Sequence, residues 1–379
     1  MRRIEARKGV MRKQFVIFFI VVQTILALVH LFLYETWAYF WYPANAYPSA
    51  GVELALTILA LSFPLTTLLS FISRDLASRL FYAISSTWIG FGSYAFYGAI
   101  GCWLVAASAA LIGASPSRRL IAGIFLTSAF VATGYGVVNA AIPRVRLFHI
   151  KLNNLPANWR GRRIAVVSDL HLGPLRGRRF SARIVDMLNH LAPDAVLVPG
   201  DFFDGSTVGL IEMAAPWSNL RTTHGAYFAA GNHEQFRDDK PYLEALERAG
   251  IRVLRDECVS VAGLQIAGVQ FRDTVHPAHY RNVLSEMEID PTRSSILLSH
   301  SPSHLGIPAN AGVSLQISGH THGGQFWPYT WITKRIFGPY VHGLHSFGKT
   351  QVLTTYGAGT WGPPLRVGTT PELVLIEFE

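Results

Sequence analysis

The chain has few charged residues and few cysteines for its length. Of 379 residues, only 15% are charged, and Cys102 and Cys258 are the two cysteines. Two cysteines imply no disulfide framework, which fits a reducing compartment. Low charge together with 50% hydrophobic residues is unusual for a soluble enzyme and predicts a membrane part.

The C-terminal part also lacks the positive charge that the whole chain carries. The net charge is +9, yet residues 164–379 hold 17 Lys/Arg against 20 Asp/Glu. Positive charge is concentrated in segments 1–13 and 143–163, with six basic residues in each. A nucleic-acid-binding domain usually has a basic face, so we expect no nucleic-acid partner. Basic segments beside apolar stretches instead indicate membrane topology and contact with anionic lipid.

Four apolar stretches predict transmembrane spans near residues 15–34, 52–72, 80–114 and 120–142. The third is long for one helix and short for two, and we interpret it as one helix, extended or bent near Gly98–Gly101. The first could also be a signal peptide, because Ala44-Asn45-Ala46 resembles a cleavage site. Its length, and the apolar spans that follow, favour an uncleaved anchor.

Four spans place both ends of the chain on one side of the membrane. The basic N-terminus, Arg74, Arg79 and the basic segment 143–163 predict that this side is the cytoplasm, although Arg118 and Arg119 favour the opposite orientation. We therefore expect a helical transmembrane bundle over 1–142, a basic linker over 143–162 and a catalytic domain over 163–379.

The last part of the chain alternates apolar strands with helical stretches, which is typical of an α/β fold. Expected strands are Ile164–Val167, Ala195–Val198, Ala226–Ala229, Ile296–Leu298, Leu315–Ile317, Val352–Tyr356 and Leu373–Phe378, and expected helices are Ser181–Leu191, Pro241–Ala249 and Pro277–Met287. We find no internal repeat.

Polar side chains follow five of these strands. They are Asp169 and His171, then Asp201, then Asn232 and His233, then His300, and finally His320 and His322. Functional groups in open α/β folds gather beyond the carboxyl ends of strands, so we expect one shared site. Carboxylates, imidazoles and an amide suit two divalent ions of Mn, Fe, Zn or Mg, and Asp201 is the natural bridging ligand.

The local spacing has expected physical reasons. In Asp169-Leu-His171 and His320-Thr-His322, alternate residues of an extended segment would point to the same side. Gly200, Gly231 and Gly319 each precede a ligand, where we expect the chain to turn sharply.

These blocks together resemble the calcineurin-like metallophosphoesterase superfamily. Its blocks D-x-H, G-D-x-x-D, G-N-H-[DE], H and G-H-x-H read here as Asp169–His171, Gly200–Asp204, Gly231–Glu234, His300 and Gly319–His322. The sequences SDLHLGP and GHTHGGQ resemble the membrane-associated branch, which includes bacterial inner-membrane phosphoesterases and UDP-diacylglucosamine hydrolases. The resemblance implies a sandwich of two mixed sheets flanked by helices, and a bacterial inner-membrane location.

The resemblance also implies roles for single residues. Asp169, His171, Asp201 and His322 would hold one metal, and Asp201, Asn232, His300 and His320 the other. A hydroxide bridging the metals would attack phosphorus, and Asn232 would help to hold the phosphoryl oxygens. His233 would protonate the leaving group, with Glu234 orienting its ring. Gly205 follows Asp204 where Ser/Thr protein phosphatases have Arg, which argues against that activity.

Two further segments are candidates for substrate contact. Arg176 and Arg178 follow the first metal block and either form a solvated helix face or bind an anionic substrate. The stretch Phe326–Ile332, continued by Ile336-Phe337, is rich in aromatic residues. It either packs in the core or forms an apolar lip at the membrane surface.

We therefore predict a membrane-anchored hydrolase of a phosphomonoester, phosphodiester or pyrophosphate, with a substrate that could be lipid-linked. One alternative is a catalytically weak metal-binding sensor or envelope scaffold, which would not need His233 and Glu234. The other is a nuclease or cyclic-nucleotide phosphodiesterase, which the acidic domain disfavours.

Overall fold

The computed structural model describes residues 2–43, 46, 48–73, 75–236 and 238–379. Within these residues the chain divides into two compact units, one up to Tyr135 and one from Gly136 onward. Ala44 and Asn45 of the possible cleavage site, and Arg74 of the topology argument, lie outside the described residues.

The first unit is helical. Its helices are α1 (Arg2–Trp41), α2 (Ala50–Leu69), α3 (Leu76–Leu111) and α4 (Arg118–Ala140), of which α4 ends in the second unit. All four are long and apolar enough to cross a membrane, which confirms the predicted number of spans. The third stretch is one continuous helix of 36 residues, which begins where the Asp75 carboxylate accepts a hydrogen bond from the N–H of Ser78.

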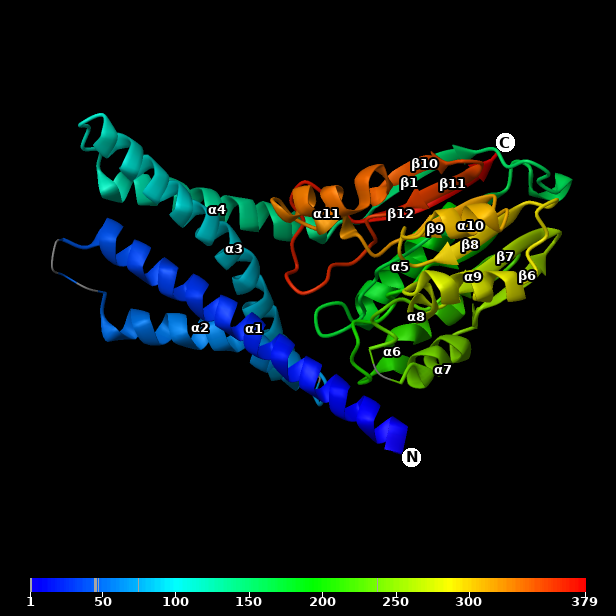
Figure 1. The fold of residues 1–379 in the computed structure, drawn as a ribbon, viewed down its shortest axis with the longest axis horizontal. Helices are drawn as coiled ribbons and strands as arrows, with labels where there is room; N and C mark the ends of the chain where they lie inside the picture. The colour runs from blue at the N-terminus through cyan, green and yellow to red at the C-terminus, as the bar shows by residue number, and fades with distance from the viewer. Residues whose placement is uncertain (1, 44–45, 47, 74, 237) are drawn as a thin grey trace. The chain divides into compact units, whose positions relative to one another are not determined.

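The second unit contains two mixed six-stranded sheets (Figure 1). The first has the order β1 (Arg144–Ile150), β12 (Glu372–Phe378), β2 (Arg163–Val166), β3 (Ala195–Val198), β4 (Ala226–Phe228) and β5 (Ile251–Val253). The second has the order β10 (Gly343–Phe347), β11 (Thr350–Thr354), β9 (Leu315–Ser318), β8 (Ser295–Ser299), β7 (Leu264–Val269) and β6 (Glu257–Val261). In each sheet the central strands run parallel.

Helices cover the outer face of each sheet. The helices of this unit are α5 (Arg178–Leu191), α6 (Leu210–Ala214), α7 (Lys240–Arg248), α8 (Phe271–Thr274), α9 (Pro277–Glu286), α10 (Gly306–Asn310) and α11 (Tyr329–Phe337). Apolar residues of α5, α6 and α7 pack on the first sheet, and those of α9 and α10 pack on the second. A third apolar cluster lies between the sheets. These four layers confirm the expected α/β sandwich.

The structure corrects the predicted linker at 143–162. Residues Arg144–Ile150 form β1, which pairs in parallel with β12 at the edge of the first sheet. Most side chains of this strand are exposed, and several are basic. Because its side chains are exposed and basic, the sequence of this segment resembles a solvated linker, although its main chain is hydrogen-bonded to β12.

Candidate metal centre

The parallel strands bring the predicted ligands to one rim. Asp169 and His171 follow β2, Asp201 follows β3, Asn232 follows β4, His300 follows β8, and His320 and His322 follow β9. All of these side chains except Asn232 and His320 belong to buried residues, and those two are partly buried. Burying so many polar groups is costly unless they are paired or hold a cation.

One group of donors contains Asp169, His171 and His322. The Nε2 atoms of His171 and His322 lie 3.0 Å apart, and Nε2 of His322 lies 3.4 Å from Oδ1 of Asp169. Oδ2 of Asp201 lies 3.8 Å from Nε2 of His171. These four are the residues that the resemblance assigned to one metal.

A second group of donors lies around the same Asp201 oxygen. Its Oδ2 is 3.2 Å from Nε2 of His300. Oδ1 of Asn232 lies 3.1 Å from Nε2 of His300 and 2.9 Å from Nδ1 of His320. Asp201 therefore faces both groups through one oxygen, as a carboxylate that bridges two ions through a single oxygen would.

The donor spacing fits divalent cations. Two ligand atoms each about 2.1 Å from one ion, at about a right angle, are about 3 Å apart. The nitrogen and oxygen separations of 2.9–3.4 Å within the groups match this value. Two nitrogen or oxygen lone pairs this close repel each other unless a proton or a cation lies between them, so the residues fit two metal ions.

Two of the predicted ligands are oriented through their second ring nitrogen. Nδ1 of His171 lies 3.2 Å from Oδ1 of Asp204, and Nδ1 of His300 lies 2.7 Å from the carbonyl oxygen of Pro199. An N–H at each Nδ1 donates to these oxygens and leaves the lone pair of Nε2 free for a metal. Asp204 is thus placed to orient the ring of His171.

The pKa values show how charge is distributed in the site. Burial alone would lower the pKa of His300, but the carboxylate of Asp201 raises it to about 9. Burial would raise the pKa of Asp201, but His300 and His233 hold it well below its usual value. The pKa of His320 falls to about 4 through burial and the neighbouring His300. Metal binding would therefore displace a proton from His300.

Five of the predicted ligands have a left-handed backbone, with φ of 52° at Asp169, 47° at His171, 50° at Asp201, 66° at His320 and 46° at His322. We expected extended D-x-H and H-x-H segments, and the structure corrects this. Left-handed conformations are unfavourable for residues with a Cβ and concentrate at functional sites, where the surrounding fold enforces them.

Glycines allow the strand ends to approach each other. Gly200 has φ of 95°, and a Cβ there would lie 2.6 Å from Nδ1 of His300. Gly319 has no positive φ, but a Cβ there would overlap Asp169 and Ser168. The expected sharp turn therefore holds at Gly200, whereas Gly319 is required for close approach.

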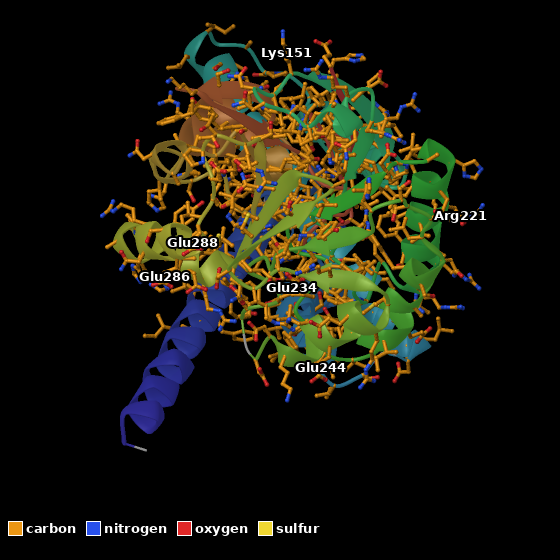
Figure 2. All side chains as sticks on the ribbon, turned by 90° about the vertical axis from the view of Figure 1, so that its right-hand side faces the viewer. Lys151, Arg221, Glu234, Glu244, Glu286 and Glu288 are labelled. Carbon is orange, nitrogen blue, oxygen red and sulfur yellow. The ribbon has the colours of Figure 1, made fainter. Side chains whose placement is uncertain are left out.

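The position of Glu234 corrects its expected role. Glu234 is fully buried, and Figure 2 shows it near the middle of the view, whereas Lys151, Arg221 and Glu244 lie toward the rim. Its carboxylate accepts hydrogen bonds from the N–H groups of Asp201, Phe203 and Gly231, at 3.1, 2.9 and 3.0 Å. These bonds join the β3 and β4 loops, so Glu234 fixes the backbone of the site. Burial and the charge of Asp201 raise its pKa to about 7.

Asp204 is the carboxylate beside the ring of His233. Its Oδ1 lies 3.6 Å from Nδ1 of His233, which is buried without a hydrogen-bond partner. On the other side of the ring, Nε2 lies 4.0 Å from Oδ2 of Asp201. Burial lowers the pKa of His233, and the two carboxylates counteract this. A small movement of Asp204 or His233 would complete the orienting hydrogen bond.

Arg176 is not positioned for substrate. Its side chain is buried and donates to Oγ1 of Thr360 at 2.6 Å and to the carbonyl of Ala140, at the end of α4, at 3.0 Å. It therefore caps a helix and anchors a loop, which corrects its expected role in substrate binding. Arg178 is exposed at the start of α5, and its substrate contact stays a prediction.

The sequence reasoning missed Arg366, which is fully buried. Its guanidinium donates to the carbonyls of Tyr356 and Gly359, at 2.6 and 2.7 Å, and Nη2 lies 3.2 Å from Nδ1 of His322. Burial first, and then His171 and Arg366, hold the pKa of His322 well below its usual value. Arg366 thus ties the loop after β11 to His322, a predicted metal ligand. No local sequence motif identifies Arg366, because most of its hydrogen-bond partners are main-chain carbonyls.

The fold and the donor groups are those of a metallophosphoesterase site. The family model described as calcineurin-like phosphoesterase matches residues 162–324, and the chain belongs to this family.

Relatives from distant organisms share the domain. A "Transmembrane protein with metallophosphoesterase domain" of Danio rerio is 32% identical over 68% of this chain and 62% of its own length. A metallophosphoesterase of Helicobacter pylori strain 26695 is 32% identical, over 63% of this chain and 64% of its own length, and one of strain J99 is 30% identical, over 69% and 73%. The chain thus spans slightly under two thirds of the first two relatives. Together with the four apolar helices, this similarity indicates a membrane protein.

Proposed function

We propose that this protein is a membrane-anchored phosphoesterase that uses two divalent metal ions to hydrolyse a phosphomonoester, a phosphodiester or a pyrophosphate. The supporting observation is the single Asp201 oxygen that faces both donor groups, 3.2 Å from His300 and 3.8 Å from His171. Asp169, His171, Asp201 and His322 would hold one ion, and Asp201, Asn232, His300 and His320 the other. Bound cations would supply Lewis acidity toward phosphoryl oxygens and lower the pKa of a water.

The side chains around the metals would contact the phosphoryl group and protonate the leaving group. The amide of Asn232 lies at the rim, where it can contact a phosphoryl oxygen. His233 belongs to neither of the two proposed ligand sets, and a nearby phosphoryl anion would favour its protonated form. It would then donate that proton to the departing oxygen, with Asp204 holding its ring.

We further propose a lipid-linked substrate and a cytoplasmic catalytic unit at the bacterial inner membrane. Three residues separate the end of α4 at Ala140 from the start of β1 at Arg144, so the catalytic unit is covalently held close to a bilayer. The basic segment 143–163 supports the cytoplasmic side.

The test uses the full-length protein in detergent with Mn²⁺. It should hydrolyse 4-nitrophenyl phosphate or bis(4-nitrophenyl) phosphate, and His233→Ala should lower kcat by about 10²–10⁴-fold, the usual contribution of a general acid. The variant should still bind two Mn²⁺ per chain, as measured by elemental analysis. Loss of one ion from the variant would make His233 a ligand, and failure of the wild-type protein to bind metal would refute the proposed function.

A further inference from the structure

Two exposed aromatic rings flank His233. The side chain of Phe236 is 58% exposed, and its ring centroid lies 4.6 Å from that of His233. The side chain of Trp361 is also 58% exposed, and its ring centroid lies 6.1 Å from that of His233. Large exposed aromatic side chains bury much apolar surface when a ligand covers them. Both rings therefore offer apolar surface beside the same imidazole.

The main chain that carries Trp361 is held on both sides by one buried amide. Its N–H donates to Oε1 of Gln325 at 2.9 Å, and its carbonyl accepts from Nε2 of Gln325 at 3.1 Å. Nε2 of Gln325 also donates to the carbonyl of Pro363 at 2.8 Å. Arg366 binds the carbonyl of Gly359 in the same loop. The loop is thus fixed on both sides of an indole that remains exposed.

The loop that contains Phe236 is also held by hydrogen bonds. The side chain of the neighbouring Gln235 accepts a hydrogen bond from the N–H of Arg272 at 2.7 Å and donates to Oε1 of Gln270 at 3.0 Å. The main-chain N–H of Gln235 also donates to the carbonyl of Asn232 at 3.1 Å. A fixed main chain lowers the entropy that the ring would lose on binding a ligand. The two rings come from different loops, one after β4 and one between β11 and β12.

We infer that Phe236 and Trp361 form a clamp for an alkyl chain on the leaving group of the substrate. This inference rests on the proposed function, in which the metal ligands hold the phosphoryl group and His233 protonates the departing oxygen. The group attached to that oxygen must then lie next to His233, between or against the two rings. Apolar carbon atoms there would be removed from water, whereas a polyhydroxylated group would lose hydration.

The experiment compares two monoesters whose leaving groups are both primary alcohols, hexyl phosphate and glycerol 1-phosphate. The Mn-loaded full-length protein should have a higher kcat/KM for hexyl phosphate. Phe236→Ala and Trp361→Ala should each lower the ratio of the two kcat/KM values by about tenfold, which is typical for losing part of an apolar pocket. Trp361→Phe should restore most of the ratio. Phe347→Ala, which removes another exposed ring on β10, is the matched control and should leave the ratio at its wild-type value.

A binding measurement separates the clamp from catalysis. Calorimetry should show that hexylphosphonate binds the Mn-loaded protein about tenfold more tightly than methylphosphonate. Trp361→Ala should remove most of this difference. Equal affinity of the two phosphonates for the wild-type protein, or an unchanged difference in both alanine variants, would overturn the clamp. Absence of hydrolysis of every ester by a wild-type protein that still prefers hexylphosphonate would refute the proposed function and leave the clamp standing as a binding site.

Discussion

At the scale of single residues, one carboxylate oxygen of Asp204 lies close to the rings of two histidines. Its Oδ1 lies 3.2 Å from Nδ1 of His171, a proposed ligand, and 3.6 Å from Nδ1 of His233, the proposed acid. Such a carboxylate fixes the tautomer of a ligand and the direction of its lone pair.

We predict that Asp204→Asn weakens both metal binding and turnover. The amide has nearly the same shape, but its oxygen is neutral and accepts a hydrogen bond less strongly. Loss of such a supporting group typically lowers metal affinity or activity about 10–100-fold. Calorimetric titration with Mn²⁺ and kcat/KM for 4-nitrophenyl phosphate measure the two effects. Asp186→Asn, on the exposed face of α5, should change neither. An unaltered affinity and rate in the Asp204 variant would contradict the role.

The residues that meet at the rim could be predicted from the sequence because each follows a locally recognisable strand. The contacts that hold these residues in place could not be predicted from the sequence. Glu234 and Asp204 lie in neighbouring blocks, and only the folded loops decide which carboxylate faces His233. Arg366 depends on carbonyls of a loop whose path no local pattern encodes.

At the scale of elements, α11 has no buried residue although it is an amphipathic helix of nine residues. Trp331, Ile332 and Ile336 are exposed, and so is Trp327 just before the helix. Lys334 and Arg335 lie in its last turn, and the guanidinium of Arg335 stacks 4.6 Å from the ring of Trp331. Exposed Trp and Ile beside basic residues are typical of helices that lie in a membrane interface. The alternative that this stretch packs in the core therefore does not hold for these side chains.

We predict that replacing both Trp327 and Trp331 by Asp impairs hydrolysis of a membrane-bound substrate selectively. Charged side chains would oppose contact with the lipid interface, where Trp is favoured. Turnover of a long-chain phosphatidate in anionic vesicles should fall about tenfold or more, as expected when interfacial anchors are lost. Turnover of 4-nitrophenyl phosphate should be retained. Ile211→Asp, at an exposed apolar position on α6, is the control. An equal loss with both substrates would exclude the interfacial role.

The sequence predicted the central elements better than the edge elements. β3 has the bounds expected, β9 differs by one residue at one end, and β2 and β8 differ by one residue at each end, because their buried runs are continuous and apolar. The edge strands β1 and β6 were missed, because their side chains are mostly exposed or half-buried. β7 was missed as well, although it is fully buried, because Gln265 and Gly268 interrupt its apolar pattern.

At the scale of the whole molecule, the boundary between the two units lies within a helix. The last turn of α4 belongs to the second unit, where Asn139 donates to the carbonyls of Arg366 and Thr369 at 3.0 and 2.9 Å. Arg183 donates to the carbonyl of Ala141 at 2.8 Å, just beyond that helix. The catalytic unit thus begins before the point that composition suggested.

This boundary determines at which residue a soluble fragment of the enzyme should begin. A chain that starts at residue 163 would lack β1 and would leave β12 as an unpaired edge, open to self-association. It would also remove the carbonyl that Arg176 binds inside the fold. We expect this fragment to aggregate on size-exclusion chromatography, and one that starts at residue 136 to elute as a discrete species with a single cooperative melt. If the two fragments had equal solubility and melting temperature, β1 and the end of α4 would not be needed for the stability of the catalytic unit.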